Sequence, residues 1–137
     1  MNTKDQITLW TTQITTAAFF GMAGTMTTFT PIGELGTLMP WAPDAPVLTR
    51  IAGIALLLGA AGLVLPMLSS IRPQVIVLSA VLLSLAMLGA MVFHAVRGEY
   101  LMIPVNLVLL SALLFIAWGW ARITGLAPAM IVAPAKH

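Results

Sequence analysis

Four long apolar stretches, separated by short segments that hold the charges, fill most of this 137-residue chain. They cover residues 7–29, 51–68, 75–96 and 103–121. A helix needs about 20 apolar residues to cross a bilayer core of roughly 30 Å, and the last three stretches meet this condition plainly. The first contains eight threonines, whose hydroxyls can bond to carbonyls of the preceding turn and so be tolerated in lipid. The sequence therefore predicts four membrane-spanning helices.

The composition favours an all-α fold, an integral membrane four-helix bundle with a single membrane domain over residues 1–137. Hydrophobic residues make up 60% of the chain and charged residues only 7%, whereas about a quarter of the residues of a soluble domain are charged. The basic residues are scattered singly, so the high pI does not indicate a nucleic-acid partner. Because the chain has no cysteine, disulfides, thiolate metal sites and dithiol relays are excluded.

The distribution of basic residues favours a topology in which both termini are cytoplasmic, because short cytoplasmic loops carry an excess of Lys and Arg. With a cytoplasmic N-terminus, the cytoplasmic side holds Lys4, Arg72, Arg122 and Lys136, and the other side holds Arg50 and Arg97. Residues 30–49 then form a long non-cytoplasmic loop with four prolines, which is typical of a functional lid or a partly re-entrant cap. The tail after Arg122 is too short to span, and we expect it either to fray or to lie along the surface.

Polar residues are predicted to meet at the non-cytoplasmic end of the bundle. His94 shares a helix face with Met87 and Ala90, about one turn below this surface. An ionisable side chain near the end of a membrane helix usually faces protein or water rather than lipid. Asn106 in the next helix lies at nearly the same depth. His94 is thus either a structural hydrogen-bonding residue or a ligand-binding or proton-carrying one.

Charged residues of the same end complete this candidate site. Arg97 and Glu99 lie in the loop above His94, and Arg50 opens the second apolar stretch on the same side. One histidine with distant carboxylates lacks the ligand spacing of a metal site, so no metal is expected. No nucleophile with a neighbouring base is recognisable, so no catalytic residue is assigned.

Small residues recur along one face of the second stretch. Ala52, Ala55, Gly59 and Gly62 follow one another at steps of three and four. Small residues allow close approach of a second helix, either inside one bundle or at a homodimer interface. The pattern does not distinguish these two uses.

The segments RIAGIALLLGAAGLVLPMLSSIRP and LSLAMLGAMVFHAVRGE, followed by an asparagine-containing helix that ends in WGWAR, resemble the DoxX-like membrane proteins (DoxX/DoxD-related). The resemblance covers residues 50–122 and implies a four-helix bundle in the bacterial cytoplasmic (inner) membrane. The family's histidine, arginine, glutamate and asparagine match His94, Arg97, Glu99 and Asn106. An acidic position of the family's second helix is Ala55 here. Relatives take part in quinone-linked sulfur oxidation, associate with redox-stress enzymes, or act as assembly factors.

Two functions of different classes follow from the residues and the resemblance. The first is a quinone-linked or redox-associated membrane subunit working with a partner enzyme, in which His94 and Asn106 bind the ring oxygens of a non-covalent quinone. The alternative is a non-enzymatic scaffold or assembly factor for another membrane protein. Expected partners are the lipid bilayer and either a protein partner or further copies of the chain. A transporter is less favoured, because no charged residue lies at the membrane midplane.

Overall fold

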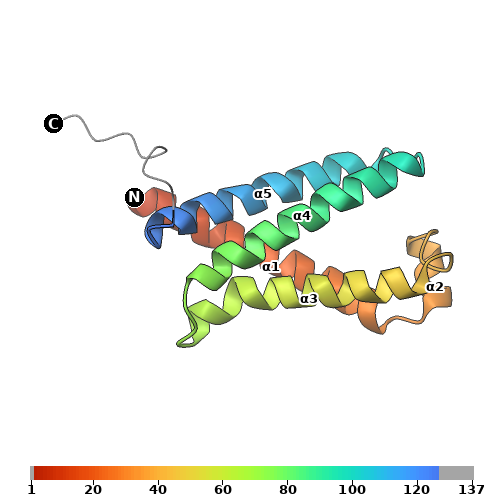
Figure 1. The fold of residues 1–137 in the computed structure, drawn as a ribbon, viewed down its shortest axis with the longest axis horizontal. Coiled ribbons are helices and arrows are strands. Elements are labelled where there is room, and N and C mark those ends of the chain that lie inside the picture. Colours follow the sequence, from red (N-terminus) through yellow and green to blue (C-terminus); the bar gives the residue numbers. More distant parts are fainter. Residues whose placement is uncertain (1, 127–137) are drawn as a thin grey trace.

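The computed structural model describes residues 2–126, which form α-helices and no strand (Figure 1). The helices are α1 (Thr3–Phe29), α2 (Ile32–Leu38), α3 (Pro46–Leu68), α4 (Gln74–Val96) and α5 (Met102–Ile123). Helices α3, α4 and α5 are each long and apolar enough to cross a membrane. The prediction of an all-α membrane protein is confirmed. Most of the tail after Arg122, residues 127–137, lies outside the described part of the chain.

The segment between the first two long helices differs from a plain loop. It contains α2, which follows Pro31 and carries Glu34 in its first turn, where a negative charge interacts favourably with the helix dipole. Helix α3 begins at Pro46, earlier than the expected residue 51. Proline fits the first turn of a helix, because its missing N–H would have no partner there. Residues 30–49 are therefore largely helical.

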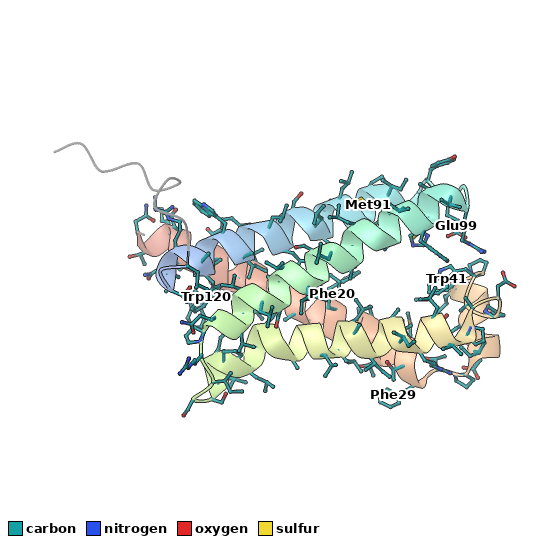
Figure 2. The ribbon with its side chains drawn as sticks, in the orientation of Figure 1. Phe20, Phe29, Trp41, Met91, Glu99 and Trp120 are labelled. Atoms are coloured by element: carbon teal, nitrogen blue, oxygen red, sulfur yellow. The ribbon has the colours of Figure 1, made fainter. Side chains whose placement is uncertain are left out.

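The long helices form two antiparallel pairs. Helix α1 packs mainly along α3, and α4 packs mainly along α5, with smaller α3–α4 and α1–α5 contacts. In Figure 1 the pairs lie close together at the end where α1 begins and separate toward the end that carries α2. Burial follows this trend. In α4 the last buried residue is Met87, although the helix continues to Val96. In α5 only Asn106 is buried among the residues that precede Leu113. Phe20 and Trp120, labelled in Figure 2, belong to the main apolar core.

Glycines set the distances between the helices. A Cβ atom at Gly53 would lie 2.9 Å from the Thr28 backbone nitrogen, so α1 and α3 touch backbone to backbone. A Cβ atom at Gly59 would lie 2.5 Å from Leu83 Cδ2, and one at Gly62 would meet Ser79. Gly59 and Gly62 therefore pack α3 against α4 within the chain, which is the first of the two uses that the small-residue pattern allows.

A buried glutamine joins three helices in the core. The amide nitrogen of Gln13 on α1 donates to the Leu63 carbonyl and contacts Met67 Sδ on α3 at 2.9 Å. Its amide oxygen accepts a hydrogen bond from the indole N–H of Trp120 on α5. The Gln13 side chain is fully buried. Since an unpaired buried polar group is costly, these three contacts fix α1, α3 and α5 relative to one another.

Replacing Gln13 with leucine should destabilise the fold, because the Trp120 N–H would lose its partner while remaining buried. The expected loss is about 1–3 kcal/mol in the free energy of unfolding. Thermal unfolding in detergent would measure it. Gln6→Leu, at an exposed position of the same helix, is the matched control and should unfold like the wild type. Equal stability of the two variants would contradict the bridging role of Gln13.

Candidate functional site

The end of α4 is shaped by a helix-terminating turn that places Glu99 on His94. Gly98 adopts φ +75°, a left-handed conformation that glycine accepts without strain. The Gly98 N–H donates to the Ala95 carbonyl and the Glu99 N–H to the His94 carbonyl. This pair of bonds is a Schellman motif, in which the second residue after the helix cap lies over the last turn. The sequence HAVRGE thus brings the Glu99 side chain back to the imidazole by local geometry alone.

The His94 ring is held by a carboxylate on one side. Its Nδ1 lies 2.6 Å from Glu99 Oε2, and only 14% of the His94 side chain is exposed. The carboxylate favours the neutral tautomer that carries its proton on Nδ1 and leaves Nε2 as an acceptor. Within residues 2–126, nothing hydrogen-bonds to Nε2. Glu99 therefore orients the His94 ring, and Nε2 is left without a hydrogen-bond partner in the described residues.

Arg97 holds the second oxygen of the same carboxylate. Its Nε donates to Glu99 Oε1 at 3.0 Å, and its guanidinium lies 3.7 Å from Asp44 Oδ2. Hydrogen bonds from Arg97 and His94 lower the pKa of Glu99 below its ordinary value of 4.5. Glu99 is consequently ionised at neutral pH. Asp44 is 71% exposed, so the series from His94 through Glu99 and Arg97 reaches water.

Asn106 occupies the corresponding level of α5. It lies seven residues before the buried Leu113, as His94 lies seven residues after the buried Met87, so both continue the core-facing side of their helix. Asn106 is only 8% exposed. Its Nδ2 is buried and has no hydrogen-bond partner in the described residues. Buried amide groups normally find a partner, so this nitrogen is a candidate donor to a bound molecule.

The Arg50 side chain makes its hydrogen bonds to α1 rather than to the other predicted site residues. Its guanidinium donates to the Thr27 and Thr28 carbonyls at 2.9 and 2.7 Å. These are the last carbonyls of α1, where the helix dipole favours a positive charge. The structure thus brings His94, Arg97 and Glu99 together. Arg50 makes its hydrogen bonds elsewhere at this end, and no hydrogen bond links Asn106 to the other site residues.

The segment after α2 connects the two helix pairs above this site. The Trp41 ring lies 5.3 Å from the Phe93 ring on α4, measured between centroids, in an edge-on arrangement. Asp44 from the same segment reaches Arg97. Figure 2 shows Trp41 and Glu99 at the same end of the fold. Sequence reasoning missed this contact, because a tryptophan near a membrane boundary is expected to serve as an interfacial anchor.

Residues 11–118 match a family model described as the DoxX-like family. The chain belongs to the DoxX-like family. The match includes His94, Arg97, Glu99 and Asn106, and it extends beyond the resemblance over residues 50–122 to take in most of α1. With three helices apolar enough to span, this DoxX-like protein is a helical membrane protein. No curated protein and no solved structure matched the chain.

The two contacts of Glu99 should make stability depend on pH. The pKa of Glu99 is lower in the folded state than in the unfolded chain. The stability that the two contacts contribute is therefore fully present above the ordinary pKa of a glutamate, and it is lost as the pH falls through the lower pKa of the folded state. The melting temperature of the wild type should therefore decline in this acidic range more than that of Glu99→Gln. Glu34→Gln, at an exposed position, is the control and should decline like the wild type. A Glu99→Gln profile that follows the wild type would contradict these contacts.

Proposed function

We propose that this DoxX-like protein is a quinone-linked membrane subunit that works with a partner enzyme. The proposal rests on one observation, the buried Asn106 Nδ2 that lacks a partner. An amide N–H donor on the inner side of a membrane helix suits a neutral ligand with a carbonyl oxygen. A quinone has such oxygens and an apolar tail that is soluble in the membrane. When bound, it would supply two-electron redox chemistry. The chain itself has no cysteine pair that could carry out such chemistry.

His94, on the neighbouring helix α4, supports the same proposal. With Nδ1 directed at Glu99, the neutral ring has Nε2 as an acceptor for a ligand hydroxyl, and the protonated ring has an N–H there for a ligand carbonyl. Histidine exchanges protons near neutral pH, and quinone reduction consumes protons. The Glu99 carboxylate, which is 28% exposed, would connect the ring to water, and Arg97 would hold this carboxylate in place. Electrons would have to come from the partner enzyme.

The proposal includes α1 as a fourth span, in a four-helix bundle of the bacterial inner membrane. At 27 residues, α1 is about 40 Å long, enough to cross the bilayer core. Its charges are confined to Lys4 and Asp5 in the first turn. The hydroxyls of Thr25 and Thr27 donate to carbonyls of the preceding turn, both at 2.7 Å. The distribution of basic residues supports cytoplasmic termini.

A scaffold or assembly factor is the second candidate, and the outer side of α1 favours it. Thr11 and Thr15 are exposed, and their hydroxyls make no hydrogen bond within the described chain. Polar hydroxyls on a lipid-facing surface favour contact with another membrane helix. A homo-oligomer or a different membrane protein would satisfy them. In this case His94 and Asn106 would be dispensable.

Binding of decylubiquinone to the purified protein in nanodiscs tests the first proposal. Asn106→Leu removes the unpaired amide and should leave the fold at least as stable, because an unsatisfied buried group is lost. The same variant should weaken quinone binding by about tenfold, equivalent to about 1.4 kcal/mol. His94→Ala should weaken it similarly. Binding can be measured by quenching of tryptophan fluorescence.

The matched control is Ser111→Ala, an exposed position of the same helix whose hydroxyl bonds only to the Leu107 carbonyl. It should bind quinone like the wild type. Unchanged affinity in both Asn106→Leu and His94→Ala would overturn the proposed site. A stoichiometric protein partner retained by both variants, without quinone binding by the wild type, would favour the scaffold.

A further inference from the structure

A pocket of about 250 Å³ lies at the end of the bundle opposite His94, between the start of α1 and the end of α5. Its lining includes Leu9, Phe115 and Gly119. A Cβ atom at Gly119 would lie 2.7 Å from Leu9 Cδ1, so this glycine allows the two helices to meet there. The pocket therefore combines apolar lining residues with its place at the end of the apolar helix α5.

Two opposite charges line the pocket without pairing to each other. Asp5 and Arg122 both contribute to its wall, yet within residues 2–126 neither side chain forms an ion pair or a hydrogen bond, and it is the Asp5 backbone N–H that donates to the Asn2 side chain. The Arg122 guanidinium instead lies 4.7 Å from the centroid of the Trp118 ring. Stacking on an aromatic face holds the cation in place and leaves its N–H groups available. The pocket thus presents one fixed positive group and one negative group to the same space.

A second hollow lies further along the contact between α1 and α5. Thr12 lies one helical turn beyond Thr8 of the pocket wall, and with Thr11, Thr15 and Thr16 it lines this hollow of about 350 Å³. Phe19 and Val108 line this hollow, and both are exposed on the outer surface of the bundle. A pocket with two charged groups at the end of the helices, and a second hollow further along the same two helices, suit the headgroup and an acyl chain of a phospholipid.

We propose that this pocket binds the phosphoethanolamine headgroup of a phospholipid. The phosphate would lie against the Arg122 guanidinium, and the primary ammonium would donate to the Asp5 carboxylate. One acyl chain would lie in the second hollow between α1 and α5. An anionic headgroup without an ammonium would leave Asp5 facing a second negative charge, and a choline headgroup has no N–H donor for it. This inference is independent of the quinone site at the other end.

Native mass spectrometry of the full chain in mild detergent tests the proposal, with phosphatidylethanolamine, phosphatidylglycerol and phosphatidylcholine of identical acyl chains added separately. The wild type should retain phosphatidylethanolamine best. Asp5→Asn should lower its affinity by about two- to fivefold, as expected for one partly exposed charge contact, and should remove the preference over phosphatidylcholine. Arg122→Gln should lower binding of all three lipids.

Arg72→Gln is the matched control, since Arg72 is exposed and lies outside the pocket. It should leave the lipid preference unchanged. Preference of the wild type for phosphatidylglycerol, or an unaltered preference in Asp5→Asn, would overturn the proposal. Soluble glycerophosphoethanolamine at the lipid concentration should not displace the lipid, because it lacks acyl chains; displacement would show that the headgroup alone is the ligand and would overturn the assignment to a lipid.

Discussion

Inside a bilayer, backbone polar groups have no water to bond to, so an apolar chain must satisfy them within helices. The remainder of this structure follows from that constraint. The charges of the described chain lie at positions where helices begin or end, or between helices. Chemistry that depends on ionisable groups is consequently confined to the two ends of the bundle. One end holds His94 with Glu99, and the other holds Asp5 with Arg122.

The two ends differ in how tightly the helices pack. The Gln13 contacts, together with Gly59 and Gly62 of α3, hold the helices together over the half that includes the start of α1. Toward α2 the buried core thins, and the pairs are connected through Trp41 and Asp44. Tight packing excludes ligands, since protein interiors leave few voids larger than a water molecule. A buried amide without a partner, as in Asn106, is accordingly found where the packing is less complete.

Parts of the site were predictable because they depend on local geometry. The spacing of His94, Gly98 and Glu99 is that of a helix-ending turn, and the distance between the two side chains follows from it. The depth of Asn106 follows from the short connection between α4 and α5. Arg50 was not predictable, because its bonds go to carbonyls of α1, which are more than twenty residues away in sequence. The contact between Trp41 and Phe93 depends likewise on how a long segment crosses the fold.

By itself, the sequence determined that the protein is helical and membrane-embedded, since the lengths and apolarity of its stretches depend only on the order of residues. It also determined the family and the residues that end α4. Only the tertiary structure decided that Gln13 bridges three helices, that Gly59 and Gly62 pack within the chain, and that Asp5 and Arg122 share a pocket without pairing. These features join residues far apart in the chain, and hydrophobic periodicity shows which side of a helix is buried but not which helix covers it.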